Sequence, residues 1–306
     1  SMTKPQFAEL PRRGVIRVSG ADAHHFLQNL ITADMEEIDK KGAGFGALLT
    51  PQGKILFDFL ILKDGDAYLL DTPAETLADL AKRLTFYRLR SKVEIADAST
   101  DLCVFACWNG TPPTDLPGVQ AEDPRLGALG WRVIGEVGSV KTAFEASGFA
   151  EASDADYAAH RIALGVPEGL ADYAYSDVFP HDADMDQLGG VSFFKGCYVG
   201  QEVVSRVHHR GTARKRMIRV SSDAALPASG TEITADGKVV GTLGSIAPDL
   251  SASGTGGTLG LALVRLDKAA AALKNGTPFQ CGSNQVTLSL PEWAGFGWPE
   301  ETAGDD

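Results

Sequence analysis

The sequence predicts an α+β protein in which antiparallel sheets with helices are followed by a small all-β module. Residues 44–70 contain apolar runs separated by turn residues, which is typical of an antiparallel meander. The segment Thr72-Pro73-Ala74-Glu75 has the cap residue, the proline and the acid that often begin a helix. Residues 212–290 contain short strands between glycine turns, a spacing that predicts a small barrel or sandwich.

The length and composition allow a large core with several parts. The chain has 306 residues, of which 44% are hydrophobic, enough for two or three subdomains. We expect an α+β core over residues 1–210, divided near residue 95 into parts of about 1–95 and 96–210. A C-terminal β module is expected over residues 211–292, followed by an acidic tail over residues 293–306.

The charge and hydropathy of the chain exclude several classes of partner. A formal net charge of -12 argues against binding to nucleic acid or to anionic membranes. The sequence has no run of about 18 apolar residues, so no membrane span is expected. The start, Ser1-Met2-Thr3-Lys4, lacks a signal-peptide core and an Arg-rich presequence, which predicts a cytoplasmic protein. A processed organellar protein would begin in the same way.

Local patterns predict the order of elements in the first half of the chain. Alternation over residues 15–18 predicts a short strand. Ser19 and Asp22 resemble a capping box that begins a helix with Phe26, Leu27, Leu30 and Ile31 on one face. Further helices are expected after Thr72, over residues 139–147, and from Ser153 and Asp156 to Leu164, and further strands over residues 93–96, 102–108 and 131–137.

The segments between and after these elements give other structural predictions. Residues 109–130 are rich in Pro and Gly and predict a surface excursion without regular structure. Residues 167–190 have weak periodicity and an acidic loop at residues 181–186, which lacks the glycine and glutamate of a calcium site. In the β module, an Asp-Gly turn predicts a hairpin over residues 233–240.

Four cysteines are too few for a disulfide framework in a chain of this length. Cys103 and Cys107 lie on a predicted strand, where four residues span about 13 Å, too far for both thiols to bind one metal ion. We interpret them as core residues, and Cys281 as part of a structural turn. Cys197 alone has polar neighbours suited to chemistry, and no resident metal site is predicted.

Residues 193–202 combine groups that neither a core nor an ordinary surface loop usually collects. Two aromatic residues precede Lys195, Cys197, Tyr198 and the polar pair Gln201 and Glu202. A lysine two residues before a cysteine can stabilise the thiolate and lower its pKa, which makes Cys197 a candidate reactive thiol with Lys195 as its partner. The alternative is a structural turn with an inert, buried cysteine.

Two segments are rich in cations and contain no acid. Residues 82–92 suit either a solvated helix end or the anionic tail of a ligand. Residues 205–219 suit either anion recognition or a protected strand edge. On such a strand His208 and His209 would face opposite ways, which argues against a two-histidine metal site.

The segment Lys195-Gly196-Cys197-Tyr198-Val199-Gly200-Gln201-Glu202 resembles the K-G-C-[YF]-x-G-Q-E motif of the YgfZ-type folate-binding family. These proteins are relatives of the glycine-cleavage aminomethyltransferase (T-protein) and assist iron–sulfur cluster proteins. Looser similarities occur at residues 14–20, 50–54, 87–93 and 161–167. The resemblance implies a T-protein-like folate-binding core of antiparallel sheets with helices and a C-terminal β-barrel.

The resemblance also implies a function and a set of site residues. It implies a protein that binds tetrahydrofolate or a related folate and assists the assembly or maintenance of iron–sulfur clusters in client proteins. Cys197 would then be a transient cluster ligand or a thiol that exchanges with a partner protein. The folate-binding candidates are Asp172, Tyr87, Arg90, Tyr198, Gln201, Glu202, Arg206 and Arg210.

Two other functions stay open. The first is a tetrahydrofolate-dependent aminomethyltransferase or another one-carbon transferase, in which a carboxylate orients the pterin and an amine. The second is an interaction module that binds no ligand. We favour an accessory folate-binding protein over an aminomethyltransferase, and whether the chain is an enzyme is left undecided.

Overall fold

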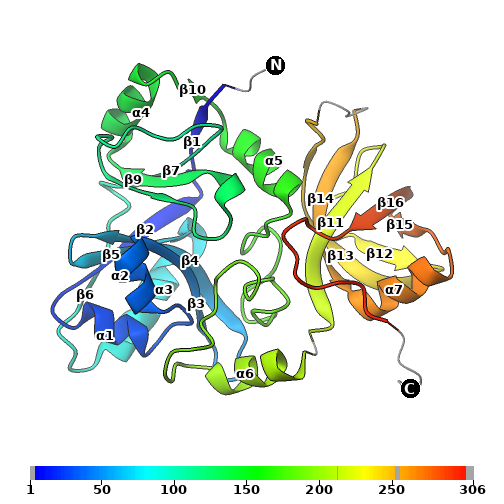
Figure 1. The fold of residues 1–306 in the computed structure, drawn as a ribbon, viewed down its shortest axis with the longest axis horizontal. Coiled ribbons are helices and arrows are strands. Elements are labelled where there is room, and N and C mark those ends of the chain that lie inside the picture. The colour runs from blue at the N-terminus through cyan, green and yellow to red at the C-terminus, as the bar shows by residue number, and fades with distance from the viewer. Residues whose placement is uncertain (1–3, 212, 252–255, 301–306) are drawn as a thin grey trace. The chain divides into compact units, whose positions relative to one another are not determined.

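A computed structural model describes residues 4–211, 213–251 and 256–300. The chain folds into two compact units, each with its own elements (Figure 1). The first comprises Ser1–Tyr157 and Leu188–Ser205, and the second comprises Ala158–Gln187 and Arg206–Asp306, over the residues described. The expected core of residues 1–210 therefore supplies residues to both units.

The first unit contains a five-stranded antiparallel sheet in the order β3-β4-β5-β2-β6. Its strands are β2 (Arg13–Ser19), β3 (Ala43–Leu49), β4 (Ile55–Asp64), β5 (Ala67–Pro73) and β6 (Glu94–Asp97). The meander predicted over residues 44–70 is formed by β3, β4 and β5. Consecutive side chains along β3, β4 and β5 are mostly buried because both faces of the sheet are largely covered, as in Ile55–Asp64, where all but three residues are buried.

A second sheet of the same unit has the order β10-β1-β7-β9-β8. Its strands are β1 (Gln6–Glu9), β7 (Cys103–Trp108), β8 (Val119–Glu122), β9 (Trp131–Gly135) and β10 (Ala150–Glu151). The prediction of an irregular excursion over residues 109–130 is wrong for β8, which pairs with β9, and for a 3-10 turn at Gly127–Leu129. A strand of four residues between turns leaves too little alternation to detect.

The helices of this unit are α1 (Ala23–Gln28), α2 (Met35–Lys41), α3 (Ala74–Arg88) and α4 (Val137–Ala146). Helix α3 begins one residue later than predicted: Pro73 is its N-cap, and the predicted cap residue Thr72 lies in β5, where its hydroxyl donates to the Asp58 carbonyl at 3.0 Å. The capping box predicted at Ser19 and Asp22 is absent, because the Asp22 carboxylate instead accepts a hydrogen bond from the Lys92 amide at 2.7 Å. Helix α1 ends at Gln28, so Leu30 and Ile31, which were predicted on the same helix face, lie in the irregular connector of six residues that leads to α2.

Two further helices follow in the chain. Helix α5 (Asp154–Leu164) begins at the predicted capping box, in which the Asp156 amide donates to Ser153 Oγ and the Ser153 amide donates to Asp156 Oδ2. Helix α6 (Gln201–Arg210) occupies the first part of residues 205–219, for which a protected strand edge was one of two alternatives. That alternative is wrong up to Arg210, and the strand begins only at Lys215.

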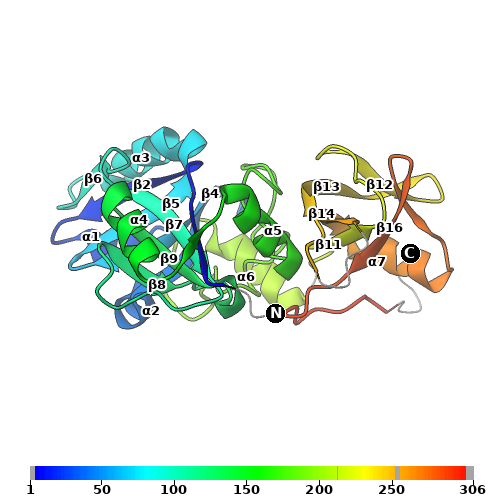
Figure 2. The same cartoon turned by 90° about the horizontal axis from the view of Figure 1, so that it is seen from above.

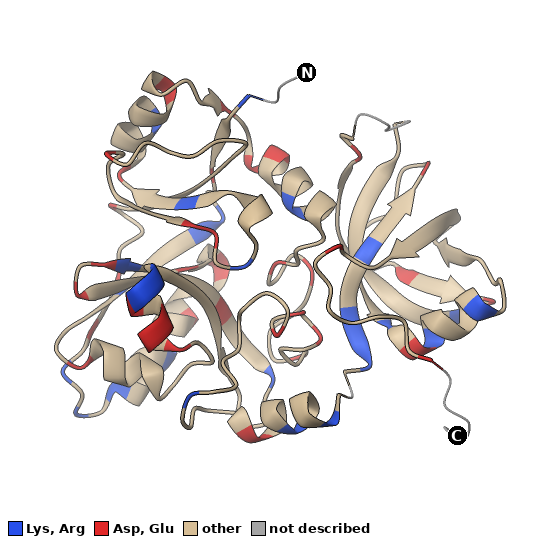
Figure 3. Ribbon diagram, viewed as in Figure 1, with Lys and Arg blue, Asp and Glu red and all other residues tan. Residues whose placement is uncertain are grey.

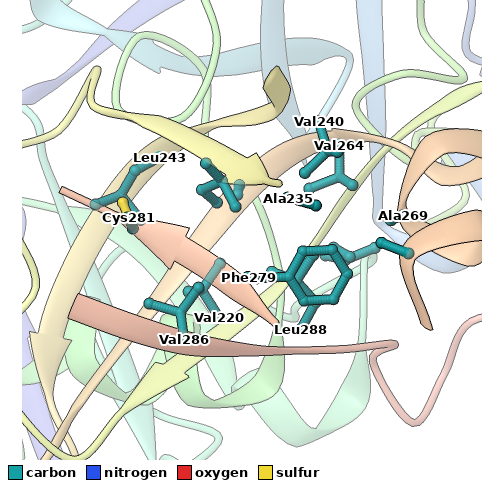
Figure 4. Packing of buried hydrophobic residues seen from close by; sticks show 14 of the residues in the cluster. Val220, Ala235, Val240, Leu243, Val264, Ala269, Phe279, Cys281, Val286 and Leu288 are labelled. Atoms are coloured by element: carbon teal, nitrogen blue, oxygen red, sulfur yellow. The ribbon is translucent and has the colours of Figure 1, made fainter. Parts of the chain in front are cut away.

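The second unit contains a closed barrel in the order β11-β14-β13-β12-β15-β16, with α7 (Leu266–Lys274) packed against it (Figure 2). The strands are β11 (Lys215–Ser222), β12 (Glu232–Ala235), β13 (Lys238–Pro248), β14 (Thr258–Arg265), β15 (Phe279–Cys281) and β16 (Asn284–Ser289). Side chains from the strands and from α7 fill the barrel (Figure 4). The Asp236-Gly237 turn has positive φ at both residues, as the predicted hairpin requires.

The segment after the barrel is not simply an acidic tail from residue 293. The Trp293 indole donates to the Leu164 carbonyl at 2.7 Å, and the Gly295 amide donates to Gln187 Oε1 at 2.7 Å. Phe296 and Trp298 pack against the barrel core. The boundary predicted at residue 293 is therefore wrong, and residues 301–306 lie outside the described residues.

A buried ion triad joins the two sheets of the first unit. Asp71 on β5 is fully buried and accepts from Arg13 Nε at 2.6 Å and from Arg132 Nε, on the other sheet, at 2.7 Å. Burial raises the pKa of the Asp71 carboxyl, but the two guanidinium groups outweigh it and hold that pKa below its usual value.

We expect Asp71→Ala to lower the free energy of unfolding by about 3–5 kcal/mol, because it leaves two guanidinium charges without their shared partner. The carboxylate contributes this stability above the unfolded-state pKa of about 3.9, and the contribution is lost as pH falls through the lower folded-state pKa. Urea unfolding at several pH values measures both effects. Asp79→Ala, at an exposed position of α3, should change stability little.

Candidate functional site

The reactive residues predicted from the sequence, Lys195 and Cys197, lie in residues 192–200, here called the signature loop, which has no helix or strand before α6. Cys197 is exposed and its thiol is free, whereas Cys107 and Cys281 are buried and Cys103 is half-buried. The alternative of an inert, buried Cys197 is therefore not what the structure contains.

The Lys195 ammonium is held by the backbone of the connector between α1 and α2 (residues 29–34). Its Nζ donates to the carbonyl of Gln28, the last residue of α1, at 2.8 Å, to that of Ile31 at 2.6 Å, and to that of Ala33. It also lies 5.2 Å from the centre of the Tyr198 ring. The predicted partnership with the Cys197 thiolate is thus replaced by three carbonyls, and Lys195 is a positioning residue.

Burial governs the ionisation of the groups beneath the loop. It lowers the pKa of the Lys195 ammonium to about 8, against an opposing effect of the Asp34 carboxylate. At pH 7 the charged form still predominates and supplies three N–H donors, one for each carbonyl. Burial also raises the pKa of the Tyr198 phenol to about 12, so this ring stays neutral.

Thr32 fastens the other end of the signature loop to the same connector. Its side chain is fully buried, donates to the Gly190 carbonyl at 2.6 Å and accepts from the Ala47 amide of β3 at 2.9 Å. Its carbonyl accepts from the Ser192 amide at 2.8 Å. The loop is consequently fixed on both sides of Phe193 and Phe194, and Cys197 is exposed on a defined backbone.

Gly200 brings the end of the loop against the turn between β3 and β4. Gly200 has a φ of +83°, and a Cβ there would lie 2.7 Å from the Thr50 carbonyl. Three residues later, the Val203 side chain packs on Gly53 of the same turn, where a Cβ would lie 2.8 Å from Val203 Cβ. Two segments that resembled the family separately, residues 50–54 and 195–202, are therefore in contact.

Gly196 differs from Gly200, because a Cβ at Gly196 would meet no atom within 4 Å and its φ is not in the left-handed region. The fold of this chain does not itself require glycine beside the thiol. An absent side chain there leaves the Cys197 backbone open to close approach by another molecule.

The other predicted folate-binding residues occupy three places. Arg90 lines a cavity of about 680 Å³ at the end of α3 with Arg88 and Lys92, and none of these three cations has an ion-pair partner among the described residues. Tyr87 is half-buried on α3 beside this cavity, and Gln201 and Glu202 form the first turn of α6. Arg206 and Arg210 are exposed on later turns of α6, where cations gather (Figure 3).

Asp172, proposed for the pterin, has a carboxylate that is already saturated within the second unit. It pairs with Arg161 at 2.9 Å, accepts from the Glu168 amide at 2.8 Å, and accepts from the amide and hydroxyl of Ser245 at 2.8 and 2.5 Å. Its side chain is fully buried. We assign Asp172 a structural role, because no oxygen is left to receive a pterin edge.

Arg216, one of the cations in the basic segment 205–219, is also structural. It binds both carboxylate oxygens of Asp186, at 2.6 and 3.0 Å, and donates to the His181 carbonyl at 2.8 Å. Burial raises the pKa of neighbouring Asp184 well above its usual value. The acidic loop at residues 181–186 therefore packs around Arg216 of β11. Among the described residues, no three His, Cys, Asp or Glu side chains are arranged to hold a metal ion.

Comparison with known proteins decides the family. The C-terminal part, residues 214–296, matches the family model described as "CAF17, C-terminal beta-barrel domain". The chain is 30% identical to the mitochondrial iron-sulfur cluster assembly factor IBA57 of Mus musculus, over 95% of this chain and 84% of that protein. It belongs to the IBA57 family. The human member is similar to the same extent, with 30% identity over 95% of this chain and 84% of its own length.

The IBA57 relatives differ in length. The homologue from Mycosarcoma maydis is 34% identical over 71% of this chain, but the matched region spans only 57% of that protein. Each of these relatives is named as mitochondrial. The predicted cytoplasmic location is therefore wrong. No helix among the described residues is long and apolar enough to cross a membrane.

The fold of this IBA57-family chain is that of the T-protein. The glycine cleavage system aminomethyltransferase T from Bartonella henselae superposes with a TM-score of 0.74, over 95% of this chain and 87% of that one, at 14% sequence identity. The predicted T-protein-like core with a C-terminal barrel is confirmed. The comparisons show the IBA57 family, whose members are named as iron-sulfur cluster assembly factors and whose fold is related to that of the T-protein. They do not name the YgfZ-type family that the signature motif resembles.

We expect Lys195→Met to loosen the signature loop, because three connector carbonyls lose their donor and each unsatisfied buried group costs about 1–3 kcal/mol. Hydrogen exchange should accelerate over residues 190–200 and over the connector. Exchange at the wild-type rate in both segments would contradict the positioning role. Lys82→Met, at an exposed position of α3, is the matched control.

Proposed function

We propose that this protein assists the assembly or maintenance of iron–sulfur clusters in client proteins, with the Cys197 thiol as its reactive group. The observation that carries the proposal is an exposed thiol on a loop that Lys195 and Thr32 hold in place. The names of the IBA57 relatives support it, since they are iron-sulfur cluster assembly factors.

The number of available thiols limits what the protein does with a cluster. Iron–sulfur clusters are usually held by several Cys thiolates, and Cys197 is the sole exposed cysteine in the described part of the chain. One thiolate supplies a single ligand position, so a cluster bound here shares its other ligands with a partner protein. The binding of the cluster between the two proteins is transient, because the cluster must pass to the client protein.

We also propose that the protein binds tetrahydrofolate or a related folate. The T-protein fold supports this, and so does the chemistry of the predicted folate-binding side chains. Tyr87 offers an aromatic face, Gln201 and Glu202 offer a donor and acceptor edge, and Arg90 with Arg206 and Arg210 offers forks for carboxylates. Tyr198 is 7% exposed and lies beneath Lys195, so its part is to support the loop beside the folate.

We expect Cys197→Ser to keep the fold and folate binding but to fail to restore iron–sulfur enzyme activity in cells that lack the protein. The loss follows because a hydroxyl oxygen is a poor ligand for the iron of a cluster. Cys103→Ser, which changes a half-buried thiol, should restore activity. Full rescue by Cys197→Ser would remove the thiol from the mechanism.

Folate binding is tested by calorimetry with tetrahydrofolate or folinic acid. We expect wild-type protein to bind, and Arg90→Gln to bind about tenfold or more weakly, because a charge-assisted hydrogen bond to a carboxylate is lost. Lys82→Gln removes one charge elsewhere on α3 and should bind as wild type does. No heat of binding to the wild type would contradict the folate proposal and leave the thiol proposal standing.

A further inference from the structure

A half-enclosed hollow of about 590 Å³ lies beside the signature loop, within the first unit. It is formed by α2, the start of β3, the end of β8 and the residues that enter the loop. The volume falls within the range of about 300–1,000 Å³ that is usual for ligand sites. The hollow contains none of the residues proposed for folate.

The floor of the hollow is apolar, and one aromatic side chain on its edge is uncovered. Ile38, Phe45 and Val191 supply buried floor atoms. Phe194 lines the hollow with a side chain that is 98% exposed, the most exposed large hydrophobic group among the described residues. An isolated phenyl ring in water gains free energy when another molecule covers it.

The residues that line the hollow include four carboxylates and one ammonium, so its walls are net negative. Asp123 is bound by Arg125 at 2.9 Å, and Glu37 lies 3.5 Å from Lys41. Asp34 and Glu122 also line the hollow, and neither has an ion-pair partner among the described residues. Asp34 accepts hydrogen bonds from the Glu36 amide and Gln28 Nε2, both uncharged donors.

The hollow and the signature loop, which carries the thiol, share residues and hydrogen bonds. Ala33 and Asp34 line it and also belong to the connector, where the Ala33 carbonyl accepts from Lys195 Nζ. Ser192 lines it and donates its amide to the Thr32 carbonyl. Phe194 precedes Cys197 by three residues, so a molecule seated on Phe194 contacts the loop that carries the thiol.

We infer that this hollow docks the protein partner in cluster transfer, through a chain segment that places a Lys or Arg beside an apolar side chain. The apolar side chain covers the floor and Phe194, while the cation meets Asp34 and Glu122. The inference rests on the proposed function, and it names the chemistry of the partner surface. It also explains why an aromatic ring is held in solvent three residues before the reactive sulfur.

The first test replaces Phe194 with the photoreactive amino acid p-benzoylphenylalanine in the full chain and irradiates cells. The expected product is a cross-link to an iron–sulfur protein, at a peptide that contains a Lys or Arg next to an apolar residue. A cross-link to an acidic peptide, a cross-link to a second copy of this chain, or no protein cross-link would overturn the inference.

The second test measures iron–sulfur enzyme activity in cells that lack the protein and carry Phe194→Ser or Glu122→Lys. Loss of one buried phenyl ring should weaken docking by about tenfold or more, so both variants should restore activity poorly. Leu250→Ser and Glu145→Lys change exposed residues outside the hollow and should restore it fully.

Unchanged folate binding and unchanged alkylation of Cys197 in Phe194→Ser and Glu122→Lys show that the fold and the proposed site are intact. If these two variants restore activity fully while Cys197→Ser does not, the docking inference is overturned and the proposed function stands. If Cys197→Ser also restores activity, the proposed function itself has failed.

Discussion

The site depends on one cation without a carboxylate partner: the Lys195 ammonium, which donates to three backbone carbonyls at the end of α1 and in the connector. Carbonyls at a helix C-terminus are left without partners by the helix itself, and they carry partial negative charge. Lys195 satisfies them, and the exposed thiol two residues later gains a fixed position. Burial lowers the pKa of this ammonium to about 8.

Rigid support and exposed chemistry are divided between neighbouring residues of the signature loop. Lys195 and Tyr198 face inward, and Gly200 permits close contact with the turn between β3 and β4. Phe194 and Cys197 face outward, and Gly196 adds no bulk beside them. This alternation suits a protein that presents a thiol to another protein, because the partner meets a preorganised surface.

Local features were predictable and tertiary ones were not. The capping box at Ser153 and Asp156 and the hairpin at residues 233–240 depend on nearby residues, so their patterns are reliable. A strand edge was an alternative for residues 205–210 because cations without acids suit one, whereas the structure forms α6 there, with Val203 packed on Gly53. The partners of Lys195 are backbone carbonyls 162 to 167 residues away, and no side-chain pattern could reveal them.

The hold of the connector on the signature loop is tested most directly by native-state hydrogen exchange at the Ser192 amide, resolved by NMR. That amide donates to the carbonyl of fully buried Thr32, although Phe194 and Cys197 nearby are exposed. If the connector holds the signature loop, the Ser192 amide should exchange at least about a thousandfold more slowly than an unstructured amide. Exchange at the rate of an unstructured chain would show that the loop is not held, and would contradict the account.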